Sequence, residues 1–259
     1  MSLALDLRRV RSLAGAESRL LVRNRTALVN VILLPLGMVA LFATIGGGDA
    51  LGVTVLTMIA CAGLTFVVYY TLITSLVARR QDLVLKRLKS GESPTWVIMT
   101  GMAVPLLIVL LAQLVLGIAA AAAIGDLSTM INPVLLPIAL ILGTATWTLL
   151  AIASTSFTRT VEAAQITTLP MIFVPLFLSG ISIPLQFLPE LLQQIAQFLP
   201  LSPVVELFRL GLTGAGADGA RLSLPETFQA AIRPVLIMLG WIVVGAVWAR
   251  RSFHWDPRR

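Results

Sequence analysis

Residues 79–92 read RRQDLVLKRLKSGE and join two long apolar runs, Leu51–Val77 and Trp96–Ile124. The whole connector, Ala78–Pro94, is short, basic and amphipathic, so it is too polar to cross a membrane and too regular for a loose loop. Each flanking run is longer than the roughly 20 apolar residues that a membrane-spanning helix needs. The pattern therefore predicts a short helix on the basic side of a membrane, where it contacts another component.

The composition of the chain is typical of a membrane protein. Of its 259 residues, 58% are hydrophobic and 12% are charged, whereas a soluble domain has about half apolar and a quarter charged residues. The formal net charge is +7, and because the positive residues gather at the ends of apolar runs, we expect membrane lipid rather than nucleic acid as a partner. With one cysteine, Cys61, and one histidine, His254, the sequence predicts no disulfide within the chain and no metal site.

Six apolar segments are long enough for membrane-spanning helices. They are Thr26–Ile45, Leu51–Val77, Trp96–Ile124, Val134–Phe157, Gln165–Leu185 and Ala230–Ala249. Basic residues mark the cytoplasmic side of a membrane protein, and all of the 19 except Arg209, Arg221 and Arg233 fall on one side of this arrangement. The sequence therefore predicts an all-α, multi-pass plasma-membrane protein with six transmembrane helices, both of whose termini lie in the cytoplasm with the connector.

Residues 1–25 are basic but also carry an apolar stripe. Leucine, valine and alanine recur at helical spacing, and Arg8, Arg9, Arg11 and Arg19 mostly occupy the other side. This pattern predicts an amphipathic helix that lies in the headgroup region before the first span. A flank that is merely basic is the alternative interpretation.

Residues 182–210 are divided by prolines into pieces too short to span a bilayer. We expect two short helices that enter the outer leaflet as a re-entrant hairpin between the fifth and sixth spans, packed on protein. The candidate residues of an exterior gate are Pro184, Pro189, Pro200, Glu206 and Arg209. Glu206 and Arg209 are three residues apart, which allows an ion pair within one helix; a gate contact with another subunit is the alternative.

The motifs of several enzyme classes are missing from the sequence. There is no phosphate-binding loop with its lysine, no nucleophile elbow and no zinc-protease motif, so we expect a non-catalytic chain that binds no cofactor. The first five predicted spans contain no Asp, Glu, Lys or Arg, which argues against an ion-coupled secondary transporter or channel. The energy for any transport must then come from elsewhere, and the connector is where it could enter.

Uncharged polar and aromatic residues inside the spans are candidates for a substrate path. The set is Tyr69, Tyr70, Thr74, Thr144, Trp147, Gln165, Thr168 and Phe173. A hydroxyl in a helix can also bond to its own backbone, so packing is the alternative for each.

Two parts of the chain resemble the type-2 ATP-binding-cassette (ABC) exporter permeases. Residues 178–185 (LSGISIPL), 188–196 (LPELLQQIA), 199–203 (LPLSP) and 206–209 (ELFR) are similar to the C-terminal signature of that family. The connector is similar to its coupling region, which carries a Leu-x-x-Leu core, here Leu85-Lys86-Arg87-Leu88. The family often has a Glu and then Gly-Thr before this core, where this chain has Gln81-Asp82-Leu83-Val84.

The resemblance implies that residues 1–259 form one transmembrane permease domain, with a connecting helix at 1–25, a coupling helix at 78–94 and exterior re-entrant helices at 182–210. It implies a second permease subunit, in a homodimer or a heterodimer, and separate ATPase subunits that bind ATP and Mg. The residues expected to contact the ATPase are Arg79, Arg80, Leu83, Leu85, Lys86, Arg87 and Leu88. Their charges can steer an acidic partner, or they serve only to fix the topology.

The resemblance also implies an exporter, and the short exterior loops favour a hydrophobic or amphipathic small molecule, drug-like or lipid-like, as in multidrug efflux. A lipid-linked glycan is the alternative cargo. It favours a channel lined by aromatic rings, and aromatic residues make up only 7% of this chain.

Overall fold

The computed structural model describes residues 3–23, 37, 51–90, 94–124, 130–183, 185–216 and 219–253. Within these ranges the chain is helical, apart from turns and an isolated antiparallel bridge between Ala215 and Arg221. The helices are α1 (Leu3–Arg23), α3 (Leu51–Ala62), the π-helix η1 (Gly63–Tyr70), α4 (Thr71–Gln81), α5 (Val84–Ser90), α6 (Thr95–Ile124), α7 (Leu135–Ser154), α8 (Val161–Thr167), α9 (Leu169–Leu178), the 3₁₀ turn η2 (Leu185–Phe187), α10 (Glu190–Ala196), α11 (Ser202–Thr213) and α12 (Leu224–Ser252).

Five helical segments in the described part of the chain are long and apolar enough to cross a membrane. They are Gly52–Gln81, Thr95–Ala119, Leu135–Ser154, Val161–Leu178 and Leu224–Ser252. They correspond to the second to sixth predicted spans, which confirms an all-helical, multi-pass architecture; the first predicted span, Thr26–Ile45, lies outside the described residues. The last span begins at Leu224 rather than Ala230, because Ser223 and Glu226 form a capping box at its N-terminus.

The fifth predicted span, Gln165–Leu185, is shifted toward the N-terminus in the structure. It begins at Val161, where the hydroxyl of Thr160 caps α8 by accepting a hydrogen bond from the Ala163 amide at 3.1 Å. It ends at Leu178, because the chain turns through Gly180, whose φ of +85° is a left-handed conformation that glycine adopts without strain.

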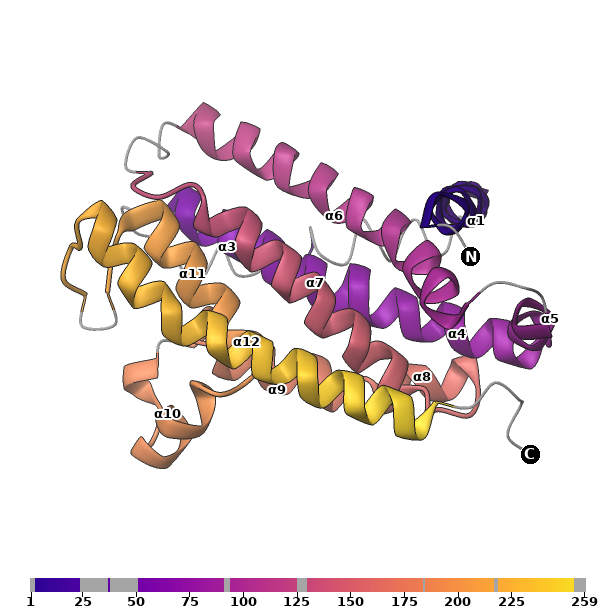
Figure 1. The fold of residues 1–259 in the computed structure, drawn as a ribbon. Coiled ribbons are helices and arrows are strands. Elements are labelled where there is room, and N and C mark those ends of the chain that lie inside the picture. The colour runs from indigo at the N-terminus through magenta and orange to yellow at the C-terminus, as the bar shows by residue number, and fades with distance from the viewer. Residues whose placement is uncertain are drawn as a thin grey trace.

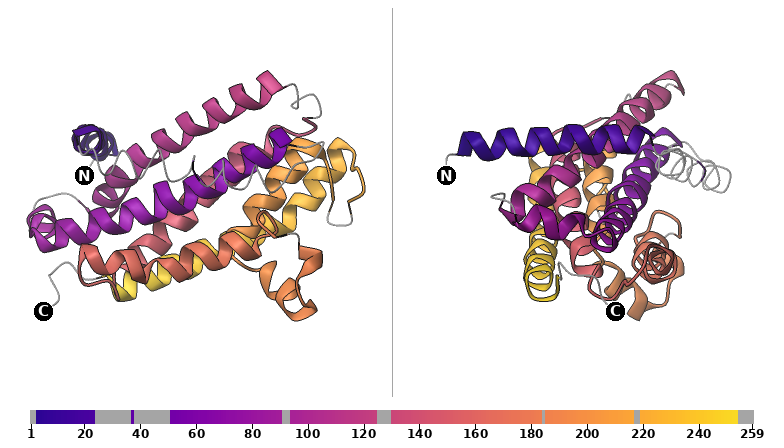
Figure 2. Two further views of the ribbon diagram at one scale, coloured as in Figure 1. Left: turned by 180° about the vertical axis from the view of Figure 1, so that it is seen from behind. Right: turned by 90° about the vertical axis from the view of Figure 1, so that its right-hand side faces the viewer.

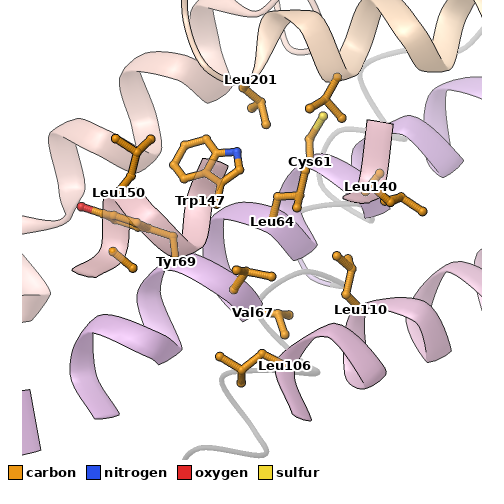
Figure 3. Packing of buried hydrophobic residues seen from close by; sticks show 14 of the residues in the cluster. Cys61, Leu64, Val67, Tyr69, Leu106, Leu110, Leu140, Trp147, Leu150 and Leu201 are labelled. Atoms are coloured by element: carbon orange, nitrogen blue, oxygen red, sulfur yellow. The ribbon is translucent and has the colours of Figure 1, made fainter. Parts of the chain in front are cut away.

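The long segment α3–η1–α4 forms the centre of the bundle. Most of its side chains are buried, including Leu64 and Val67, and they pack against Leu106 and Leu110 of α6 on one side (Figure 3). The π-helical turns of η1 lie in the middle of this span, so side chains after it face different directions than an unbroken α-helix would give.

The helices α1 and α5 lie at one end of the bundle and run across its axis. Figures 1 and 2 show α1 crossing beside the first turns of α6, at the same end of the bundle as α5 and the C-terminal end of α12. α1 packs on α6 where Gly101 allows a close approach: a Cβ at this position would lie 2.7 Å from Leu13 Cδ2. Ala14 is also buried, whereas Leu7 and Val22 are exposed. A helix with apolar side chains on two sides fits the predicted position between protein and lipid, which stays a prediction.

Candidate coupling site and transport path

The corner between α4 and α5 has a defined backbone geometry. Leu83 has φ +59°, a conformation that is uncommon for any residue except glycine. Hydrogen bonds run from the Leu83 amide to the Arg80 carbonyl (3.3 Å) and from the Arg87 amide to the Leu83 carbonyl (3.1 Å). The chain therefore turns sharply, and α5 leaves at a large angle to α4, as Figure 1 shows.

The side chains of α5 divide into an inner and an outer set. Leu85 is fully buried and Leu88 packs against the core, while Leu83 and Arg87 are exposed. The side chains of Lys86 and Lys89 lie outside the described residues. Of the predicted coupling residues, Leu83 and Arg87 are thus available to a partner, and Leu85 instead fixes α5 to its own bundle.

Arg80 is buried, with only 1% of its surface exposed. Its Nη1 donates a hydrogen bond to the Thr155 carbonyl at 2.9 Å, and its Nη2 donates to the Thr158 carbonyl. Both acceptors follow the end of α7, where carbonyl groups have no partner within the helix and where the helix dipole favours a cation. Arg80 therefore connects the end of α4 to the turn between α7 and α8, and this chain does not present it at the surface.

Arg79, the adjacent residue, points to a different helix. Its Nη2 donates to Glu17 Oε2 of α1, and both side chains are largely buried. Burial raises the pKa of the Glu17 carboxyl above its ordinary value, and the neighbouring Arg79 opposes this shift without cancelling it. Because successive side chains on a helix are about 100° apart, Arg79 reaches α1 and Arg80 reaches α7. The α4–α5 corner is thereby connected to both.

Sequence reasoning did not find the partners of these two arginines. The acceptors for Arg80 are main-chain carbonyls, for which no residue type is diagnostic. Glu17 did carry a signal, because it is one of only two acidic residues in the basic α1, the other being Asp6.

The structure places most predicted path residues in the core of this chain. Tyr69 and Trp147 are fully buried and meet edge to face, with ring centroids 5.5 Å apart (Figure 3). The Tyr69 hydroxyl lies 3.0 Å from Ser154 Oγ, to which it donates. The hydroxyls of Thr74 and Thr168 donate to carbonyls of their own helices. The hydroxyls of these two threonines are therefore bonded to the backbone, which is the alternative interpretation given by the sequence.

Three other candidates lie on the surface or near it. Gln165 is exposed on α8 and Tyr70 is half-buried. Phe173 of α9 stacks on Phe177, with centroids 5.9 Å apart and an angle of 20° between the rings. Together Gln165, Phe173 and Phe177 give α8–α9 a face that is both polar and aromatic.

Thr144 lines a cavity of about 890 Å³ between α6, α7 and α12. None of the other predicted path residues, all of which the structure describes, contributes to its lining. The remaining polar groups of the cavity include Thr148 and Arg250. The predicted path residues therefore do not gather at one site within a single chain.

Of the predicted gate residues, Pro189 and Pro200 lie just before α10 and α11, Glu206 and Arg209 are on α11, and Pro184 is outside the described residues. Pro189 caps α10 and Pro200 is buried before α11. Burial raises the pKa of Glu206, and the charges of Arg209 and Arg233 oppose this. Arg233 belongs to α12 and was not predicted to take part. α11 is packed inside the bundle, with Val204, Leu207 and Phe208 fully buried.

α12 also holds the segment that follows α10. Trp241 Nε1 donates to the Phe198 carbonyl at 2.7 Å, and Arg233 donates to Gln197 Oε1. These contacts give the short helices a fixed position against the last span. The entry of α10 and α11 into the membrane as a hairpin stays a prediction.

The fold defines a helical, multi-pass membrane protein with a short helix at a corner outside its spans. The family model for the ABC-2 type transporter matches residues 8–213. The chain therefore belongs to the ABC-2 type transporter family and is a membrane subunit, the permease component, of an ABC transporter. The comparison with curated proteins finds no match. The roles of the individual coupling, path and gate residues stay predictions.

Proposed function

We propose that this chain is the membrane subunit of an exporter that moves a hydrophobic or amphipathic small molecule out of the cell. A separate subunit supplies the energy by binding ATP and Mg and hydrolysing the ATP. The observation that carries this proposal is the α4–α5 corner: it exposes Leu83 and Arg87 to a partner, while Arg79 and Arg80 connect the same corner to α1 and α7.

The proposal includes six spans with α1, α5 and the C-terminus in the cytoplasm. Figure 1 shows α1, α5 and the C-terminal end of α12 at one end of the bundle and the first residues of α3 at the other. The asymmetric distribution of basic residues supports the cytoplasmic assignment of the first end. α10 and α11 then lie on the exterior side, where a re-entrant hairpin packs on α12.

The mechanism we propose begins with the ATPase moving α5. Because Leu85 and Leu88 fix α5 to the bundle and hydrogen bonds hold the corner at Leu83, α5 and α4 move as one body. Arg80 transmits this displacement to the turn that precedes α8, and hence to the start of the fifth span. Arg79 transmits it to α1. Motion at this corner then reaches α4, the start of the fifth span and α1.

A second permease subunit fits the face that α8–α9 leaves exposed. Gln165 is exposed there beside Ile166, whose exposed fraction is 73%. An amide facing lipid would be costly because lipid offers it no hydrogen bond. We therefore place this face toward a second copy or a related subunit, with the transport path between the two. Homodimer and heterodimer remain alternatives.

A lipid-linked glycan is the second candidate cargo, and one observation favours it. The stacked Phe173 and Phe177 on this face provide the aromatic surface that sugar rings prefer. Export assays with a fluorescent amphipathic compound and with a lipid-linked sugar distinguish the two cargoes.

The experiment that tests the proposal uses the complex of the permease with its ATPase in lipid vesicles. The charge reversal Lys86→Glu with Arg87→Glu should keep ATP hydrolysis and abolish export. The matched control is Arg251→Glu, a reversal of an exposed charge at the same end of the bundle, which should leave both activities unchanged. Export at the wild-type rate in the double variant would contradict a coupling role for α5.

A further inference from the structure

The proposed transport mechanism does not involve the cavity between α6, α7 and α12. Its volume is about 890 Å³, within the range of roughly 300–1,000 Å³ that is usual for small-molecule sites. Figure 1 shows α7 running between α6 and α12. Most of the lining is apolar, from Met99, Val104 and Leu107 on α6 to Ile141 on α7 and Phe253 after α12. A ligand for this cavity must therefore be largely hydrocarbon.

Two hydroxyl groups lie in the apolar lining one turn apart. Thr144 and Thr148 both line the cavity, and their Oγ1 atoms are buried without a hydrogen-bond partner. Threonines elsewhere in the chain, such as Thr74 and Thr168, bond to their own backbone. Because both oxygens have almost no accessible surface, they do not face the open part of the cavity, and the surface that a ligand meets on α7 is apolar.

Arg250 and Trp96 lie where the cavity meets the end of the bundle. Arg250 is exposed in the last turn of α12, and Trp96, 46% exposed, is in the first turn of α6. Arginine and tryptophan are the side chains that mark the membrane–water interface. The opening of the cavity thus lies at headgroup depth on the side of α1 and α5, the side that holds most of the positive charge.

We propose that this cavity binds one anionic phospholipid from the leaflet on the side of α5. The phosphate lies against Arg250, and an acyl chain extends along Leu107 and Ile141. Charge complementarity selects this occupant: a second protein copy would have to bury Arg250, whereas a lipid phosphate neutralises it in place. The site is separate from the α8–α9 face, so it does not depend on the proposed cargo path.

The test uses the full chain in nanodiscs that contain equal amounts of phosphatidylglycerol and phosphatidylcholine. Photoactivatable diazirine acyl chains are placed on one lipid at a time, and cross-linked peptides are located by mass spectrometry. Phosphatidylglycerol should label the cavity residues of α6, α7 and α12 about fivefold more than phosphatidylcholine, the factor expected for one arginine near a charged surface.

Three variants test the parts of the site. Arg250→Gln should lower phosphatidylglycerol labelling to the level of phosphatidylcholine, while Arg251→Gln, the neighbouring charge that does not line the cavity, should not. Ala145→Trp should fill the cavity and prevent labelling by both lipids; its thermal midpoint, compared with that of the wild type, checks that it folds.

Several results would overturn the proposal. They are equal labelling by the two lipids, labelling spread over the bundle surface, the same loss in both arginine variants, and displacement of the label by an exported compound. The last result would assign the cavity to the cargo. Loss of export in the variants of α5 has no bearing on these outcomes, so failure of the proposed function and failure of the lipid site are distinguishable.

Discussion

Replacing Arg80 with methionine removes the contact between α4 and the end of α7 while keeping most of the buried stem. The change leaves the carbonyls of Thr155 and Thr158 without their donor in a buried site. Each unpaired buried group costs about 1–3 kcal/mol, but methionine also relieves the desolvation cost of a buried charge. We therefore expect a net loss near the lower end of the sum, about 2–3 kcal/mol.

The loss of stability should be visible as a lower thermal midpoint of the purified chain. For a chain of this size, about 2–4 °C per kcal/mol corresponds to a decrease of about 4–12 °C. Arg251→Met is the matched control, because it removes an exposed charge at the same end of the bundle, for which a change within about 0.5 kcal/mol is expected.

Arg80→Met should also uncouple the complex. With the ATPase bound, ATP hydrolysis should persist while export per ATP falls by about five- to 150-fold, the range for a coupling free energy of 1–3 kcal/mol. A midpoint and an export ratio both equal to those of the wild type would refute the view that Arg80 transmits motion between α4 and α7.

The remaining predictions concern contacts of the core and of α1. Tyr69→Phe, which removes only the bond to Ser154, should cost about 1 kcal/mol, and Trp147→Ala about 3–5 kcal/mol; equal midpoint changes in the two would contradict the assigned packing. Gly101→Leu should detach α1, because even a Cβ there meets Leu13, and protease cleavage within α1 reports this; unchanged cleavage would count against the docked position. Because the pKa of Glu17 is raised above its ordinary value of 4.5, folding takes up a proton there, so stability should fall as pH rises from 4.5 through the folded pKa. Glu17→Gln should remove this dependence, and an unaltered pH profile of the midpoint would show that Glu17 is not its source.

Sequence patterns predicted the helices of this protein well and the direction of its side chains poorly. The alternation of apolar and basic residues in 83–89 predicts α5, because a helix at a surface must separate the two kinds. Arg79 and Arg80 look equivalent in the sequence. Their roles differ because one faces a carboxylate on α1 and the other faces carbonyls after α7, which only the packing of distant segments decides.

The path residues show the same limit. Tyr69 and Trp147 are polar aromatics in apolar spans, which is a reasonable signal for a ligand site, yet their rings pack edge to face in the core and the Tyr69 hydroxyl donates to Ser154. The π-helical turns of η1 come just before α4, and the change in helical register that they cause is not visible in an apolar run. Thr144 and Gln165 meet the same criterion, yet Thr144 lines the cavity between α6, α7 and α12 and Gln165 is exposed on α8.

The central claim is that a separate ATPase drives this chain through α5, and purification tests it most directly. The tagged chain, extracted from its native membrane in mild detergent, should bring down an ATP-hydrolysing subunit in equal amount. Leu83→Asp with Arg87→Glu should abolish this association while leaving the thermal midpoint of the chain unchanged, since both residues are exposed. Purification of the intact chain without any ATPase, or undiminished association in the double variant, would contradict the account.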